Sequence, residues 1–409
     1  MSSAPAMYAA NVRKVYLYQG STNLMLFMPV WIVFMQTDRH LSLTQVTAML
    51  GFSWFVSAVA EVPTGAVADT LGRRFSLILG TVLVAVGTAL VAVLTGYWMI
   101  LAAYLLWSVG LALQSGSDLA LLYDSLQLAG REQDYEQVAG RSFSIILLAQ
   151  GVSSVAGGLL AGIALNLPLL ATSVCTVVGL FFALSLKEPP VERVGRPSYT
   201  RTLREAAGLV RRRRGLLPLM LFSATLGVVP WVLLFVLFQP YLDGRGVPIA
   251  WFGALFLVLR LAGVAGSRLG PRLIPPEARQ RWLTVVPLVF CVLFVAMAVV
   301  PPWAVVFVLM FVVGFLQGCV RPALSDLLNK RLEGSVRATV LSLQSLLLTL
   351  LIAVFQPAAG WISDRTSPTG VFVMLAGVSL VAALLRELWR RSERAGAGAP
   401  AAAPVVSSP

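Results

Sequence analysis

Few of the residue types that soluble enzymes use for catalysis are present in this chain. Among its 409 residues there are one histidine and three cysteines. The histidine, His40, stands in a short polar connection, so we do not expect catalysis that depends on a histidine. Cys175, Cys291 and Cys319 lie in apolar stretches without the spacing of a metal site or of paired extracellular cysteines. We therefore expect no enzyme activity, no bound metal and no cofactor.

Charged residues are scarce as well. They make up 12% of the chain, against roughly 25% in an ordinary soluble domain. Hydrophobic residues make up 58%, and the mean hydropathy is +0.83. A soluble globule could not hide this many apolar side chains, so lipid must cover the remainder. The phosphate-binding pattern G-x-x-x-x-G-K-[ST] is also absent, which excludes this route to ATP as the energy source.

The charges that are present are mostly positive, with a formal net charge of +13. They gather in short segments between apolar runs, such as 73–74, 211–214 and 390–391. In membrane proteins such basic connections mark the cytoplasmic side and attract anionic lipids. We expect a multi-pass protein of the cytoplasmic membrane with both termini in the cytoplasm. A nucleic-acid partner is not expected, because few aromatic residues accompany the arginines.

Twelve apolar stretches are long enough to cross the hydrocarbon core, which takes roughly 20 residues. They are 15–36, 44–67, 75–95, 98–123, 142–164, 167–186, 216–240, 248–269, 282–300, 303–325, 338–360 and 370–389. The predicted fold is an all-α membrane protein with two six-helix transmembrane bundles related by pseudo-two-fold symmetry. The predicted domains are an N-terminal bundle (1–186), a cytoplasmic linker (187–214), a C-terminal bundle (215–390) and a disordered cytoplasmic tail (391–409).

The two halves of the chain carry a similar pattern at the same place. Residues 65–74 read G-A-V-A-D-T-L-G-R-R, and residues 263–272 read G-V-A-G-S-R-L-G-P-R. A second correspondence aligns Gln114–Asp118 with Gln317–Arg321. Both offsets are about half the chain, as expected for two parallel six-helix repeats.

The first of these patterns resembles the G-x-x-x-D-x-x-G-R-[KR] loop between helices 2 and 3 of the major facilitator superfamily. The resemblance implies two helix bundles that rock about a central cavity in alternating access, usually driven by a proton or substrate gradient. It also implies a role in conformational switching for the matching loop residues Gly65, Asp69, Gly72, Arg73 and Arg74. In the second copy Ser267 stands in place of the acid.

The same loop can be interpreted from its residues. Gly65 suits a close helix crossing, and Gly72 permits a tight turn. Asp69 can accept hydrogen bonds from the start of the predicted span 338–360, while Arg73 and Arg74 can pair with carboxylates or lipid phosphates. The alternative is an ordinary positively charged loop.

Ionisable and polar residues within or beside the spans are further candidates, because burying them in lipid is costly. The candidate coupling or gating residues are Glu61, Asp118, Arg260, Arg321, Asp124, Arg141, Asp326 and Arg337. The candidate cavity residues are Gln19, Asn23, Gln114 and Gln317, together with Trp231, which forms an aromatic stripe with Phe235 and Phe238. Asp118 and Arg321 stand at equivalent repeat positions with opposite charge, which predicts a gating pair. For each candidate, structural hydrogen bonding or packing is the alternative.

These observations favour a secondary transporter, acting as a monomer, that moves a small organic molecule across the membrane. Few polar residues and many aromatic residues favour export of an amphipathic compound, with protons as the expected coupling ion. One alternative is an importer of a nutrient or metabolite with the same fold. The other is a membrane receptor that does not transport.

Overall fold

The computed structural model describes residues 3–190, 208, 210, 215–299, 302–330 and 334–397. Within these ranges the regular structure is helical, with no strand. Eleven helical segments of the described chain are long and apolar enough to cross a membrane. The all-α membrane fold predicted from the composition is therefore confirmed. Most of the predicted linker 187–214, including Arg211–Arg214, lies outside the described residues.

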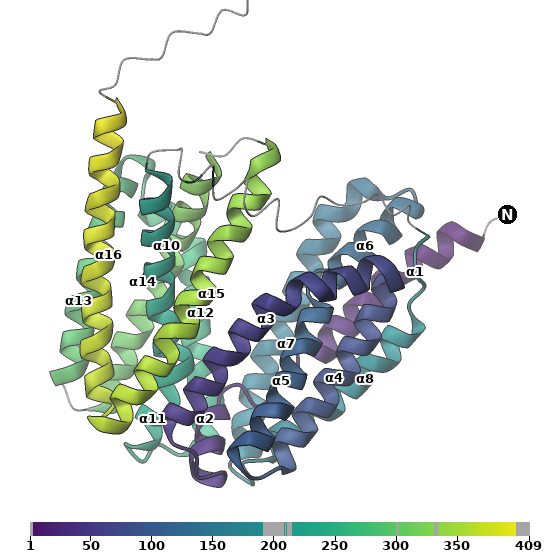
Figure 1. Cartoon of the computed structure of the whole chain (residues 1–409), viewed down its shortest axis with the longest axis horizontal. Coiled ribbons are helices and arrows are strands. Elements are labelled where there is room, and N and C mark those ends of the chain that lie inside the picture. Colours follow the sequence, from purple (N-terminus) through teal and green to yellow (C-terminus); the bar gives the residue numbers. More distant parts are fainter. Residues whose placement is uncertain are drawn as a thin grey trace, which may run out of the picture. The chain divides into compact units, whose positions relative to one another are not determined.

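The helices follow one another along the chain as labelled in Figure 1. The helices of the first half are α1 (Ser3–Thr22), α2 (Trp31–Val33), α3 (Leu43–Leu71), α4 (Arg73–Val93), α5 (Tyr97–Gln114), α6 (Ser117–Leu128), α7 (Tyr135–Ala161) and α8 (Leu167–Ser185). Those of the second half are α10 (Leu216–Val232), α11 (Phe238–Asp243), α12 (Phe252–Leu273), α13 (Arg279–Val299), α14 (Trp303–Lys330), α15 (Gly334–Arg365) and α16 (Pro368–Ala397). Short π-helical turns cover Phe34–Asp38 and Leu233–Leu237.

Contacts between residues divide the chain into two compact units. The first unit comprises Met1–Arg196, Trp231–Leu261 and Ile352–Val371. The second unit comprises Pro197–Pro230, Ala262–Leu351 and Phe372–Pro409. The first unit thus joins helices from both halves of the sequence. The predicted domain boundaries at residues 187 and 215 stay predictions.

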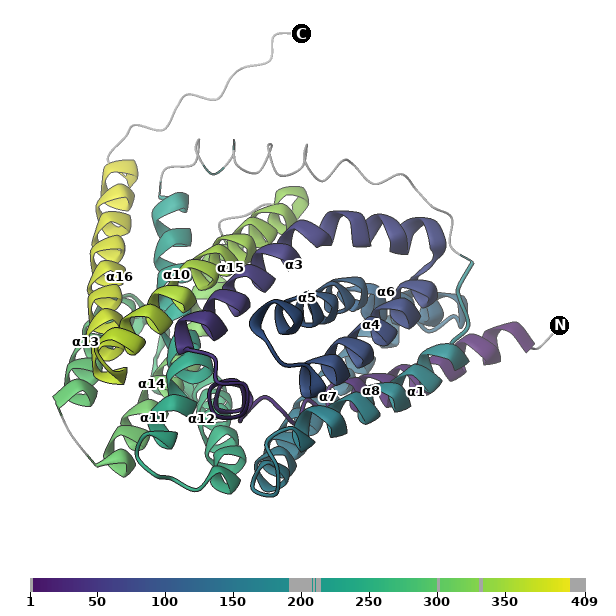
Figure 2. The ribbon, with the colours of Figure 1, turned by 60° about the horizontal axis from the view of Figure 1, so that its bottom comes forward.

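Small residues bring the helices of the first unit close together. Helix α4 packs against both α5 and α8, as Figure 2 also shows. A Cβ atom at Gly80 would lie 2.7 Å from the carbonyl oxygen of Gly110, and the reverse substitution meets the same distance. Such glycines let helix backbones approach within a membrane, where apolar burial alone does not drive helix association.

Large apolar side chains cover the outside of the same unit. Trp98 is 75% exposed, Ile163 is 77% exposed and Phe181 is 67% exposed. Exposing this apolar surface to water would be energetically unfavourable, whereas lipid tails are as apolar as the side chains themselves. The exposed apolar surface agrees with helices that face lipid.

The first predicted span, 15–36, is not one helix. Helix α1 ends at Thr22, and the chain resumes helical structure only at Trp31. We call residues 23–30 the helix break. Its sequence cause is local, because the side chains of Ser21, Thr22 and Asn23 bond the carbonyls of the preceding turn, and Pro29 disfavours a helical residue before it. The apolar composition of 15–36 concealed these signals.

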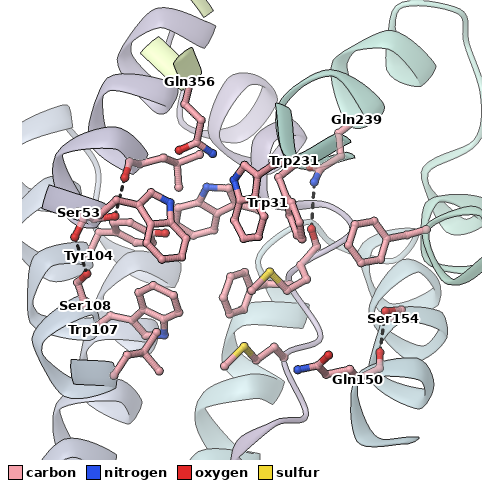
Figure 3. Close-up of a pocket in the computed structure, with 18 of the residues that line it drawn as sticks. Trp31, Ser53, Tyr104, Trp107, Ser108, Gln150, Ser154, Trp231, Gln239 and Gln356 are labelled. Carbon is pink, nitrogen blue, oxygen red and sulfur yellow. Dashed lines mark hydrogen bonds between the residues drawn. The ribbon is translucent and has the colours of Figure 1, made fainter. Parts of the chain in front are cut away.

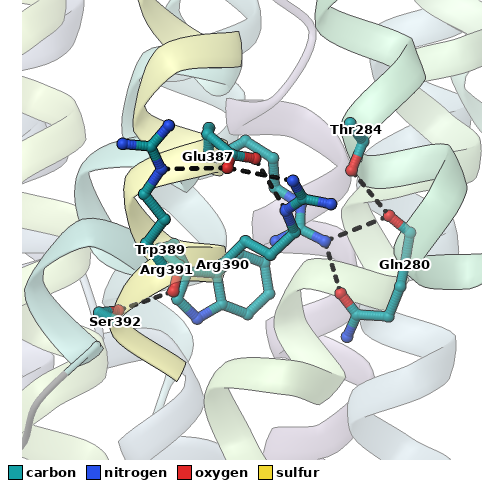
Figure 4. Close-up of polar contacts among 8 residues, drawn as sticks. Gln280, Thr284, Glu387, Trp389, Arg390, Arg391 and Ser392 are labelled. Carbon is teal, nitrogen blue, oxygen red and sulfur yellow. Dashed lines mark hydrogen bonds and ion pairs between the residues drawn. The ribbon is translucent and has the colours of Figure 1, made fainter. Parts of the chain in front are cut away.

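The predicted disordered tail begins too early. Helix α16 continues from Pro368 to Ala397, so residues 391–397 are helical. Figure 4 shows one reason: Glu387 pairs with Arg390 and with Arg391, at the three- and four-residue spacing that supports a helix. Residues 398–409 lie outside the described residues.

Candidate functional site

A cavity of about 290 Å³ lies within the first unit. Figure 3 shows residues that line it. They come from the helix break, from α2, α3, α5 and α7, and from α10, α11, α12, α15 and the π-helical turn at Leu233–Leu237. Both halves of the sequence therefore contribute to one cavity.

Aromatic rings form much of the cavity lining. Trp31, Tyr104 and Trp107 make a stacked series, with centroids 5.0 Å apart for the first pair and 4.9 Å apart for the second. Trp231, one of the predicted cavity residues, also lines the cavity and meets Trp54 edge to face at 5.5 Å. Its ring lies 4.3 Å from that of Phe235. A ligand in this cavity would meet mainly flat, apolar surfaces.

The helix break reaches the cavity through Met25, Phe27 and Met28. Backbone that leaves the helical path at membrane depth must find other hydrogen-bond partners. Gln239 supplies two of them, because its Oε1 accepts from the Ile32 N–H at 2.7 Å and its Nε2 donates to the Met28 carbonyl at 3.0 Å. The break is thus held by a residue from the other half of the sequence.

Two further contacts fix the middle of the break. The Leu26 N–H donates to Thr172 Oγ1 at 2.9 Å. On the opposite side, a Cβ atom added at Gly157 would overlap the Leu26 carbonyl oxygen. Helix α7 can therefore lie against the break only because residue 157 is glycine. Sequence analysis missed Gln239 and Thr172, although a glutamine in an apolar run was a usable signal.

Three polar atoms at the cavity lining have no hydrogen-bond partner among the described residues. They are the indole nitrogens of Trp31 and Trp231 and the Oε1 atom of Gln356. A buried donor or acceptor without a partner costs about 1–3 kcal/mol. All three atoms are enclosed by protein, so a ligand in the cavity would reach them only after the side chains around them move.

Arg260 also lines the cavity. Its Nη2 donates to Gln150 Oε1 at 2.7 Å, and its guanidinium lies 6.0 Å from the centre of the Phe256 ring. Glu61, another of the predicted coupling or gating residues, is exposed and does not line this cavity. Arg260 therefore contributes a positive charge to the lining, while Glu61 lies elsewhere on α3.

Three other predicted cavity residues, in the first unit, bond helices together instead. Gln19 donates to Asp118 Oδ2 at 2.7 Å and accepts a hydrogen bond from Ser142. Asn23 donates to the Gln19 carbonyl at 3.0 Å, and its Oδ1 accepts a hydrogen bond from Gln150 Nε2 of α7 at 3.4 Å. Gln114 bonds Thr81 at 3.4 Å. None of the three lines the cavity described here.

The predicted pair of Asp118 and Arg321 stays a prediction. Asp118 lies in the first turn of α6 and belongs to the first unit, with Gln19 as a partner. Arg321 is an exposed residue of α14 in the second unit. The fifth predicted cavity residue, Gln317, belongs to the same helix, and its Oε1 has no partner among the described residues.

The loop that carries the family-like pattern is held by Glu188. Its two carboxylate oxygens accept hydrogen bonds from the Arg73 and Arg74 N–H groups, at 2.8 and 2.6 Å, at the start of α4. A carboxylate at a helix N-terminus accepts hydrogen bonds from the free N–H groups and interacts favourably with the positive end of the helix dipole. Gly72 has φ of 103°, a conformation that favours glycine, which agrees with the predicted turn.

Asp69 and Gly65, the two other residues of the pattern, take no part in this cap. Asp69 is exposed, and its predicted contact with the start of span 338–360 stays a prediction. A Cβ atom at Gly65 would meet none of the described residues of the first unit within 4 Å, and its predicted close helix crossing stays a prediction. The sequence pattern does not tell which of its glycines lies at a helix contact.

Two arginine–aspartate ion pairs occupy matching places in the two halves. Arg73 opens α4 and pairs with Asp124 of α6. Arg279 opens α13 and pairs with Asp326 of α14 at 3.3 Å. Of the remaining predicted gating residues, Arg141 is exposed, and the side chain of Arg337 lies outside the described residues.

The fold is similar to that of solved transporters. The nucleoside transporter NupG matches with a TM-score of 0.76 and 15% identity, over 94% of this chain and 99% of NupG. A bacterial homologue of the human lysosomal transporter Spinster, inward-facing and unoccupied, gives 0.74 and 16%, over 97% and 99%. A D-xylose–proton symporter gives 0.68 and 14%, over 93% and 96%. These likenesses concern the fold alone.

Comparison with family models assigns the chain to a protein family. No curated protein sequence gives a match. The family model described as Major Facilitator Superfamily matches residues 20–355 and 278–408. These ranges include the loop pattern at 65–74, its second copy at 263–272 and all the residues that line the cavity. The chain therefore belongs to the major facilitator superfamily.

Proposed function

We propose that this protein is a secondary active transporter that moves a small organic molecule across the cytoplasmic membrane by alternating access. The observation that carries the proposal is the cavity, since helices from both halves of the sequence line it and Arg260 adds a positive charge to its lining. Substrate sites of transporters built from repeats lie between the repeats, at positions where helices are interrupted. The helix break at 23–30 is such an interruption.

Contacts between the two halves of the sequence at one end of the first unit support a gate. Asp364 of α15 accepts hydrogen bonds from the Leu43 N–H at 3.1 Å and the Thr44 N–H at 2.7 Å, at the start of α3. The hydroxyl of Thr44 adds a third bond at 2.6 Å. These bonds satisfy free N–H groups at a helix N-terminus and tie α3 to α15.

A second contact at the helix ends also joins the two halves. A Cβ atom at Gly158 of α7 would lie 2.7 Å from the Gly253 nitrogen of α12. With the arginine-rich connections assigned to the cytoplasm, the α3–α15 and α7–α12 contacts form an extracellular gate that is closed in this conformation. Opening the gate would require Asp364 to leave the N-terminus of α3.

Export is the proposed direction, and protons are the proposed coupling ion. The cavity lining is mainly aromatic, which suits an amphipathic compound better than a sugar. Glu61 and Asp118 are the acidic residues within predicted spans that could carry a proton in such a cycle. Both termini and residues 187–214 are assigned to the cytoplasm in this proposal, and the protein acts as a monomer.

A reversible cross-link tests the gate and transport together. The three native cysteines are replaced by alanine, and Thr44→Cys and Asp364→Cys are introduced together. Proteoliposomes are loaded with a metabolite mixture, and compounds that cross the membrane along an imposed pH gradient are identified by mass spectrometry. We expect the oxidised double variant to stop movement of any transported compound and a reducing agent to restore it.

The two single-cysteine variants are the matched controls and should be insensitive to oxidation. Movement of no compound in either direction by the cysteine-free protein would contradict the transporter proposal. Full transport by the completely cross-linked protein would contradict the gate. Movement from the cytoplasmic face to the other face supports export, and the reverse supports an importer.

A further inference from the structure

The cavity contains one charged side chain, Arg260, among the described residues that line it. An arginine keeps its positive charge in proteins. Its hydrogen bond goes to the neutral amide of Gln150, and none of the ion pairs among the described residues includes it. A cation at membrane depth without a counter-charge is costly, so an anionic group on a ligand would offset that cost.

The unpaired polar atoms favour the same kind of ligand. The indole N–H groups of Trp31 and Trp231 can only donate hydrogen bonds. Like the guanidinium of Arg260, they are donors of lining residues, although both indole nitrogens are enclosed by protein until side chains move. Gln356 Oε1 is the unpaired acceptor of the lining. Among the described lining residues no carboxylate stands ready to receive an ammonium group, which argues against a cationic ligand.

The shape of the lining indicates what carries the anionic group. Trp31, Tyr104 and Trp107 stack on one another, and Trp54, Trp231 and Phe235 form a second aromatic series. Flat rings gain from offset or edge contacts with such walls. The volume of about 290 Å³ is at the lower end of the roughly 300–1,000 Å³ typical of ligand pockets. The cavity thus fits a small ligand.

We infer that the substrate is a small organic anion with a flat, largely apolar body, such as an aromatic carboxylate. This inference rests on the proposed transport function and names the substrate class of the same site. The anionic group meets Arg260, and the ring meets the aromatic walls. Arg260 is accordingly a residue that determines specificity for charge.

Four related probes test the inference in binding experiments on the purified protein in nanodiscs. The probes are 2-naphthoate, its neutral amide 2-naphthamide, the cation 2-naphthylmethylammonium and the saturated decalin-2-carboxylate. We expect 2-naphthoate to bind at least about tenfold more tightly than the amide, since hydrogen bonds to charged groups are stronger than neutral ones. The cation should bind most weakly, and the saturated acid should bind more weakly than 2-naphthoate.

Substitution at Arg260 separates a specific role from a structural one. In Arg260→Gln the difference in affinity between 2-naphthoate and 2-naphthamide should disappear, while the affinity for the amide is kept. The matched control is Arg268→Gln, which removes a charge from an exposed position of the same helix. The control should keep the full difference between the two probes.

Several outcomes overturn the inference. They are tightest binding of the cation, equal binding of acid and amide, a difference that survives Arg260→Gln, or no binding of any probe. The transporter proposal is judged separately, because the metabolite mixture assumes no substrate class. Transport that is observed there together with any of these outcomes leaves the function standing and removes the substrate class.

Discussion

Two regions of the first unit differ in whether their polar groups have partners. Around the start of α4, Arg73 pairs with Asp124 and also donates to the Ala120 carbonyl at 2.6 Å, and Glu188 caps the helix. At the cavity, the indole nitrogens of Trp31 and Trp231 have no partner. In the first region the polar groups form bonds that hold helices together. The second leaves two buried donors without a partner among the described residues, on side chains that line the cavity.

The largest effect should come from breaking the paired region. In Asp124→Ala, Arg73 loses its acid in a poorly solvated place, since the two side chains are 7% and 18% exposed. Removing one partner of a buried pair costs about 3–5 kcal/mol. We expect a clearly lower melting temperature of the purified protein. The matched control is Asp134→Ala, whose pair with Arg131 has side chains 35% and 50% exposed. Equal melting temperatures for both variants would contradict the comparison.

A smaller and different effect is expected at the cavity. Trp231→Phe removes an N–H group that has no partner, while an aromatic ring stays against Phe235 and Trp54. We expect a much smaller loss of stability than for Asp124→Ala, but weaker binding of 2-naphthamide. One neutral hydrogen bond of about 0.5–1.5 kcal/mol corresponds to a loss of about two- to tenfold. Unchanged affinity would mean that the indole N–H does not meet the ligand.

The smallest effect should come from the ion pair of the second unit. Arg279 and Asp326 match Arg73 and Asp124 by position, but their side chains are 33% and 38% exposed. Exposed pairs contribute about 0–1 kcal/mol. We expect Asp326→Ala to lower the melting temperature only slightly, and added salt to reduce even that difference. A loss as large as that of Asp124→Ala would show that the two halves rely on their ion pairs equally.

The loop pattern at 65–74 predicted some features of the structure but not the residue that caps α4. From the sequence, Asp69 was the acid expected to meet a helix N-terminus. In the structure Glu188, more than a hundred residues along the chain from Arg73, caps α4. The pattern identified the family and the turn at Gly72. It could not identify Glu188, because a cap from a distant segment leaves no spacing signal next to the helix that it caps.

The cavity shows the same limit for candidate residues. Trp231 and Arg260 were found because an aromatic stripe and a charge stand out within an apolar span. Gln19 and Gln114 stood out equally well and instead bond neighbouring helices. Polarity within a span marks a residue that needs a partner. Whether that partner is another helix or a ligand depends on the direction in which the side chain points.

The sequence by itself determined the solvent, the helical class and the family. Hydropathy and length suffice for the first two, since lipid forces every span to satisfy its own backbone, and the loop at 65–74 carries the third. Local features end the helix near residue 23, but only the tertiary structure decided that the break lines a cavity and how its backbone groups are paired. That outcome depends on Gln239, Thr172 and Gly157, which reach the break from other helices. Hydrogen bonds between distant segments replace those of the lost helical turn, and local composition does not record them.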